Sequence, residues 1–108
     1  MAEETNETPA PKKAARKPDP LTQLLNEVKS ELKNVGEWET NDHYAYRRRQ
    51  HDSRASAWGR EYAKTKTLDA LILSLAFELL ACFPQERRYS AVQLAAAALK
   101  VAESESGK

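Results

Sequence analysis

The clearest chemical signal in the chain is a cluster of arginine and lysine side chains between residues 41 and 66. This segment holds seven arginines or lysines against three acids, Asp42, Asp52 and Glu61, and so carries +4, whereas the whole 108-residue chain carries +1. Cationic side chains with hydroxyls nearby suit phosphate contacts, and aromatic rings can stack on unpaired bases. The residues expected to contact nucleic acid or the carboxylates of an acidic protein are Arg47, Arg48, Arg49, Arg54, Arg60 and Lys64.

The spacing of residues in this segment predicts a helix over about Asp42–Lys64, with a break possible over Ser53–Ala57 and a weak point at Gly59. A heptad seam would face the rest of the protein and comprises Tyr44, Arg48, His51, Ala55, Trp58 and Tyr62. The roughly opposite side would carry Arg49, Ser53, Ser56, Arg60 and Lys64. Two interpretations of this basic side stay open. It contacts a partner, or it pairs with the acidic side of the preceding helix, since residues 21–40 hold four acids and two lysines.

Metal-ligating and nucleophilic groups are sparse. His43 and His51 are the only histidines, and no acidic or cysteine cluster completes a metal site around them, so no metal and no cofactor is expected. The single cysteine, Cys82, lies in an apolar stretch and is expected to be a buried structural thiol. Asp69 and Glu78 interrupt that stretch. They are expected to form its polar edge, and the alternative is a carboxylate that serves a metal or acid–base role.

Residues 68–83 are the most apolar stretch and predict a helix that is apolar nearly all the way round, capped by Thr67 and ended at Phe83 by Pro84. The stretch is 16 residues long, short of the roughly 20 that cross a bilayer, so a cytoplasmic protein without membrane contact is expected. Such a helix must be wrapped by other helices or by a second copy of the chain. This favours a homodimer over a monomer with an exposed hydrophobic docking patch. The expected oligomer interface comprises Leu71, Leu75, Phe77, Leu79 and Phe83.

The rest of the chain completes an expected all-α fold, a small bundle of about four helices. Residues 1–19 are charged and proline-rich and are expected to be a disordered tail. A helical bundle domain is expected over 20–104 and a frayed C-terminus over 105–108. The first, second and last helices are each expected to cover one flank of the apolar helix.

Start and stop signals place the first and last of these helices. Asp19 suits the cap of the first helix, whose apolar residues recur at intervals of three and four as far as Val35, just before Gly36. The last helix is expected to start at Ser90, because Gln93 follows it in the spacing of a capping box.

Three short motifs lie between Arg47 and Glu103. They are Arg48-Arg49-Gln50 with Trp58-Gly59, Leu71-Ile72-Leu73 with Phe77-Glu78-Leu79-Leu80-Ala81, and Val92 to Leu99. Together they resemble the MazG-type, all-α nucleoside-triphosphate pyrophosphohydrolases that phages and actinobacteria encode. The resemblance implies a dimeric or tetrameric helical bundle that binds a nucleotide through magnesium, which a Glu-Glu-x-x-Glu group and acids on the next helix would hold.

The carboxylates that this resemblance requires are mostly absent. Only Glu78 remains of the first group, and Ala91, Val92 and Gln93 stand where the further acids are expected. One carboxylate cannot hold the ions that neutralise a triphosphate. The resemblance therefore implies a copy that has lost catalysis.

The leading prediction is a non-enzymatic α-helical interaction module of bacterial or phage type. It would oligomerise through the apolar helix and bind nucleic acid or an acidic protein surface through the basic helix. One alternative is a degenerate MazG-like pyrophosphohydrolase that uses Glu78 with magnesium. Another is a structural or scaffolding subunit of a phage-type assembly, with the tail as a tether.

Overall fold

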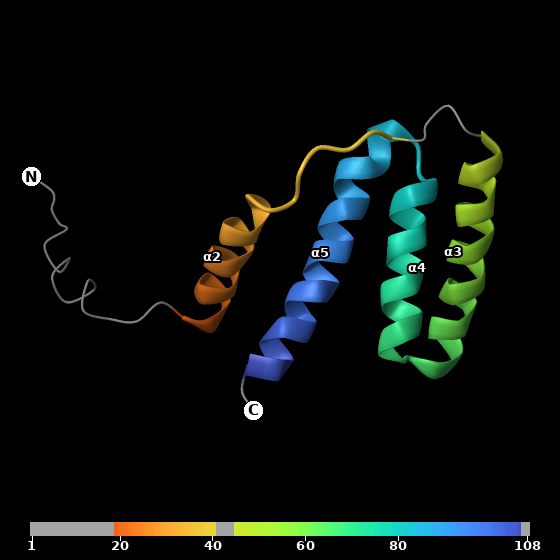
Figure 1. Ribbon diagram of the computed structural model, residues 1–108. Coiled ribbons are helices and arrows are strands. Elements are labelled where there is room, and N and C mark those ends of the chain that lie inside the picture. The colour runs from red at the N-terminus through yellow and green to blue at the C-terminus, as the bar shows by residue number, and fades with distance from the viewer. Residues whose placement is uncertain (1–18, 41–44, 107–108) are drawn as a thin grey trace, which may run out of the picture. The chain divides into compact units, whose positions relative to one another are not determined.

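The computed structural model describes residues 19–40 and 45–106, and all regular structure within these ranges is helical. The helices are α2 (Pro20–Leu32), α3 (Ala45–Thr65), α4 (Leu68–Ala81) and α5 (Pro84–Ser106) (Figure 1). This confirms the expected all-α fold of four helices. The expected disordered tail, apart from Asp19, lies outside the described residues. The chain divides after Val35 into two compact units, and each is described here by itself.

Helix α2 begins as its sequence signals predict. The Asp19 carboxylate accepts a hydrogen bond of 2.8 Å from the backbone N–H of Thr22, and Pro20 occupies the first helical position. Hydrogen bonds from the Thr22 backbone, and then from its side chain, hold the pKa of Asp19 below its usual value. The capping part of the prediction is thus confirmed.

The end of α2 differs from the prediction. The helix stops at Leu32, three residues before Val35, because the N–H groups of Asn34 and Val35 donate to carbonyls three residues back and tighten the last turn. Gly36 then adopts a φ of +30°, which favours glycine. Of the expected apolar stripe, Leu24 is buried, and the other members are exposed, namely Leu21, Leu25, Val28, Leu32 and Val35.

Helix α3 runs without a break from Ala45 to Thr65, through both Ser53–Ala57 and Gly59. Its expected first residues, from Asp42 to Tyr44, lie outside the described ranges. The other members of the predicted seam are buried or half-buried, namely Arg48, His51, Ala55, Trp58 and Tyr62. The five residues predicted on the opposite side are all exposed. The helical periodicity therefore predicted correctly which side of α3 packs.

Helix α4 starts at Leu68 with Thr67 in the cap position, but the expected capping bond is absent. The Thr67 hydroxyl instead lies 3.0 Å from the hydroxyl of Thr65. The helix ends at Ala81, two residues before Phe83, because Cys82 already adopts an extended conformation while its N–H still donates to the Glu78 carbonyl. The short link between α4 and α5 is therefore only Cys82 and Phe83.

Helix α5 starts at Pro84, and the predicted start at Ser90 is wrong. A proline at the first position has the right φ and lacks an N–H that would be unsatisfied there, and the Glu86 N–H donates to the Phe83 carbonyl at 2.9 Å. Ser90 is buried inside the helix. Gln93 does not reach back to a helix start, since its side-chain amide lies 3.4 Å from the Tyr89 hydroxyl.

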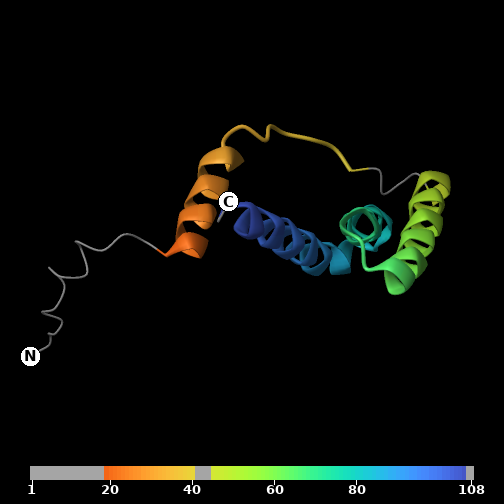
Figure 2. The ribbon, with the colours of Figure 1, turned by 90° about the horizontal axis from the view of Figure 1, so that it is seen from below.

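Within residues 45–106, α3 and α5 each contact α4 (Figure 1). Figure 2, which looks nearly along α4, shows these two helices on either side of it. The buried residues of this unit are small, namely Ala55, Ala70, Ala81, Cys82 and Ser90. Within the described ranges, no large side chain is fully buried. The three helices thus approach closely through small residues and leave larger apolar side chains of α4 half-exposed.

Candidate functional site

The outer side of α3 is the first candidate site, and we call its five exposed residues the basic face: Arg49, Ser53, Ser56, Arg60 and Lys64. At 1.5 Å per residue, Arg49 and Arg60 are separated by roughly 16 Å along the helix axis. Within the described part of the chain, neither side chain forms an ion pair or hydrogen bond, and the same holds for Lys64. The basic face therefore presents three cationic groups and two hydroxyls to solvent.

The other arginines predicted as contacts occupy different positions. Arg48 turns inward, where its Nη1 donates to the Ala81 carbonyl at 3.2 Å and its guanidinium lies 4.6 Å from the centre of the Phe83 ring. Arg54 is exposed beside α4, 5.9 Å from the centre of the Phe77 ring. Arg47 is exposed and makes contacts of its own. Arg49, Arg60 and Lys64 thus share the exposed side of α3, whereas the Arg48 side chain packs against the end of α4.

Replacing Arg48 by methionine is expected to lower the free energy of unfolding by about 1 to 2 kcal/mol, because it removes a charged hydrogen bond at the C-terminal end of α4. Methionine keeps an apolar contact with Phe83, so the change isolates the charge and the donor. Urea unfolding followed by circular dichroism measures the effect. The matched control is Arg49→Met, which should shift stability by less than about 0.5 kcal/mol. Equal effects of the two variants would contradict the role assigned to Arg48.

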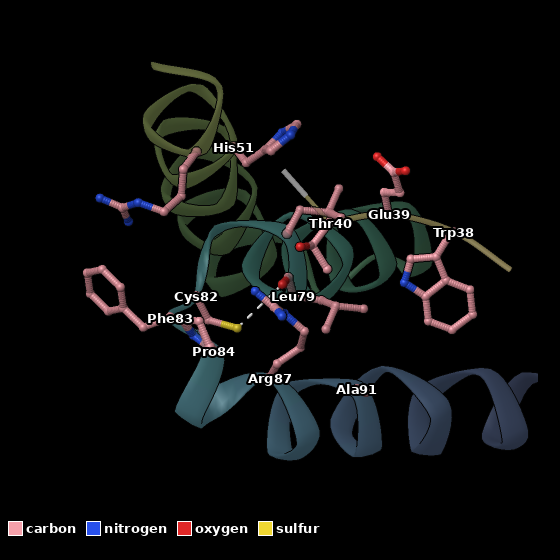
Figure 3. Close-up of a pocket in the computed structure, with 12 residues that line it drawn as sticks. Trp38, Glu39, Thr40, His51, Leu79, Cys82, Phe83, Pro84, Arg87 and Ala91 are labelled. Atoms are coloured by element: carbon pink, nitrogen blue, oxygen red, sulfur yellow. Dashed lines mark hydrogen bonds between the residues drawn. The ribbon is translucent and has the colours of Figure 1, made fainter. Parts of the chain in front are cut away.

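A cavity of about 400 Å³ is the second candidate site. It lies where α4 ends and α5 begins, beside the first turns of α3, and it is drawn in Figure 3. The residues that line it are mostly apolar, with a few polar groups: Trp38, Glu39, Thr40, Arg48, His51, Leu79, Leu80, Cys82, Phe83, Pro84, Arg87 and Ala91. Figure 3 shows Arg87 extending from α5 toward Leu79 and Cys82.

His51 lines this cavity and has one ring nitrogen without a hydrogen-bond partner among the described residues. Its ring stacks on Phe77 with 5.9 Å between ring centres. Its Nδ1 is buried and has no hydrogen-bond partner within the described structure. Cys82 is buried as predicted, and its thiol donates to the Leu79 carbonyl at 3.4 Å. The Cys82 thiol therefore provides a hydrogen bond to a backbone carbonyl in the last turn of α4.

The carboxylates of α4 lie at its edge, as the first interpretation of the sequence expected. Glu78 and Asp69 are both exposed, and Asp69 accepts a hydrogen bond from the Ala70 N–H at 2.8 Å. Among the described residues, no three histidines, cysteines, aspartates or glutamates lie together in a way that could hold a metal ion. Glu78 thus belongs to no group of three such residues in the described part of the chain.

The predicted oligomer residues of α4 separate into two groups. Phe77 lies against α3, where His51 and Arg54 contact its ring. Leu71, Leu75 and Leu79 are half-buried, and Phe83 is exposed. The sequence interpretation missed Leu68 and Leu80, both more than half exposed. We call the row at intervals of four the outer stripe of α4: Leu68, Ile72, Ala76 and Leu80.

The sequence reasoning also missed the cavity, because its lining comes from four separate segments of the chain. The one available signal was Trp38, a large aromatic residue in the otherwise polar link before the arginine-rich segment. Arg87 was not singled out because the helix was expected to begin three residues after it. The position of Arg87 at the cavity depends on the earlier start of α5 at Pro84.

None of the helices in the described ranges combines the length and apolar character needed to cross a membrane. No protein-family model matches the chain, and neither the curated proteins nor the solved structures gave a similar protein.

Proposed function

We propose that this protein is a non-enzymatic helical module that binds nucleic acid through the basic face of α3 and assembles through α4. The observation that carries the first part is the exposure of Arg49, Arg60 and Lys64 on one side of an unbroken helix. Of the two acids of α3, Glu61 is half-buried and Asp52 is exposed at the edge of the basic face, so the cations of this face outnumber the carboxylates beside it. Such a face attracts a polyanion and releases its counterions on binding.

Nucleic acid is favoured over an acidic protein by the make-up of the basic face. Ser53 and Ser56 lie between the cationic side chains, and hydroxyls with arginine or lysine are common contacts to phosphate oxygens. Helix α3 has 21 residues, which gives a length of about 30 Å. A helix of this shape fits along a duplex groove or backbone. Contacts to phosphate carry no direct sequence information, so binding through them is expected to tolerate many sequences.

The second part of the proposal is a homodimer. Domains generally bury their apolar surface between two layers of secondary structure. Within residues 45–106, α4 has one helix on each of two sides, and its outer stripe remains exposed or half-exposed. A second copy of the same stripe is a self-complementary cover in a two-fold dimer. The expectation that α2 covers α4 stays a prediction.

The experiment that tests nucleic-acid binding reverses two charges, with Arg49→Glu and Arg60→Glu combined. Fluorescence anisotropy with a short labelled mixed-sequence duplex and a single strand should show binding by the wild-type protein. Affinity should fall steeply between about 50 and 200 mM salt. The double variant should show no detectable binding and an unchanged circular dichroism spectrum, because both side chains are exposed.

The matched control is Arg88→Glu combined with Lys100→Glu, which changes net charge equally at exposed positions of α5. This control should keep most of the affinity. If both double variants lose binding alike, the interaction follows net charge and the basic face is not the site. If the wild-type protein ignores nucleic acid at low salt but binds polyglutamate through Arg49 and Arg60, the partner is an acidic protein surface. No described feature favours the pyrophosphohydrolase or scaffolding alternatives, which remain predictions.

A further inference from the structure

We infer that the cavity between the ends of α3, α4 and α5 binds a small organic anion, with an apolar body and one carboxylate or phosphate group. The anionic group would lie at Arg48 and Arg87, and the body against Phe83, Leu80 and Trp38. This site is separate from the basic face of α3. It shares Leu80 with the outer stripe of α4, so the inference is independent of nucleic-acid binding but not of the proposed dimer.

The size and lining of the cavity suit a small molecule. Its volume of about 400 Å³ lies within the range of roughly 300 to 1,000 Å³ typical of ligand sites. Its wall is largely apolar, with a small number of polar side chains, which is the usual composition of such sites. The short link between α4 and α5 brings Phe83 and Arg87 to the same cavity.

The charges at the cavity favour an anion. Among the described residues that line it, Arg48 and Arg87 carry guanidinium groups and Glu39 carries a carboxylate. Arg48 is held in place by the Ala81 carbonyl and the Phe83 ring, and its hydrogen bond to Ala81 uses one of its five donors. Arg87 also makes an interaction of its own, so an anion would add to the contacts of this side chain. A planar guanidinium suits carboxylate and phosphate groups alike.

The apolar part of the ligand follows from exposed aromatic and aliphatic side chains at the same cavity. Trp38 is 75% exposed, Leu80 55% and Phe83 52%, although all three line a concave site. A ligand with an apolar body would remove these surfaces from water, which is favourable. His51 also lines the cavity.

The test uses decanoate, decyl phosphate and decanol as probes, each kept below the concentration at which it forms micelles. The chain contains two tryptophans, so Trp58→Phe leaves Trp38 as the only indole reporter of the cavity. Decanoate or decyl phosphate should change Trp38 emission in a saturable manner, and calorimetry on the wild-type protein should give the same Kd. Decanol should bind at least tenfold more weakly than the better anion. Whichever of decanoate and decyl phosphate binds with the lower Kd identifies the anionic group that the arginines prefer.

Arg87→Met should raise the Kd of the tighter-binding anion at least tenfold. The matched control is Arg88→Met, at an exposed position outside the lining, and it should leave the Kd of the same anion unchanged. Ala91→Phe fills the cavity from an exposed position of α5 and should abolish binding, which protects the test if Arg87→Met unfolds. The combined Arg49→Glu and Arg60→Glu variant should still bind the anion. Absence of saturable binding, equal affinity for decanol, or equal loss in Arg87→Met and Arg88→Met would overturn the inference.

Discussion

Replacing Ala70 by leucine is expected to lower the free energy of unfolding by about 1 to 3 kcal/mol. Ala70 is the most buried residue of the core, with 0% of its surface exposed. It lies in α4, the helix that α3 and α5 both contact. Three extra heavy atoms at this position force the neighbouring helices apart or push side chains out of their rotamers. The effect is large for this protein because its described core consists mainly of small side chains.

Urea unfolding measured by circular dichroism checks this expectation. The matched control is Ala95→Leu, the same substitution at an exposed alanine of α5. The control should change stability by less than about 0.5 kcal/mol, since leucine and alanine are both good helix formers. Equal stability of the Ala70→Leu variant and the wild-type protein would show that α4 has free space at this position. The description of close packing through small residues would then be wrong.

Periodicity predicted the packed side of α3 because one physical rule decides it. Residues spaced by three and four share a side of a helix, so His51, Ala55 and Trp58 lie toward the same neighbour. The same rule put Arg49 and Arg60 on the exposed side. The prediction was correct in spite of Gly59, which lies within the unbroken helix.

The start of α5 was predicted wrongly because two start signals compete within seven residues. Ser90 and Gln93 have the spacing of a capping box, and Pro84 was treated only as the end of the preceding helix. A proline serves equally well as the first residue of the next helix, and the segment Gln85 to Tyr89 contains no helix breaker. Local signals alone do not rank these two starts. The burial of Ser90 within α5 is a tertiary effect that neither local signal encodes.

The cavity was beyond prediction from sequence for a different reason. Its lining residues span Trp38 to Ala91 and meet only because α4 and α5 are joined by two residues. The inward turn of Arg48 is likewise a tertiary effect. Sequence spacing placed Arg48 correctly in the packed seam of α3, but its bond to Ala81 joins residues 33 positions apart. Sequence-based reasoning therefore found the basic face and missed the cavity.

Combining Leu68→Glu and Leu80→Glu in the outer stripe of α4 is expected to abolish the proposed dimer. Both leucines are more than half exposed, so the folded unit should tolerate the change. In a two-fold dimer each substitution occurs twice, so four carboxylates would face one another in an apolar interface. Burying unpaired charges is costly. The dimer should therefore weaken by several orders of magnitude.

Light scattering after size exclusion measures the mass. The wild-type protein should elute as a dimer of the 12.2 kDa chain, and the double variant as a monomer with unchanged circular dichroism. The matched control combines Ala57→Glu and Ala63→Glu at exposed positions of α3 and should remain dimeric. A dimer that survives in the α4 variant but is lost on Leu25→Glu with Leu32→Glu would place the interface on α2. A monomeric wild-type protein would contradict the dimer and leave the outer stripe as a surface for a different partner.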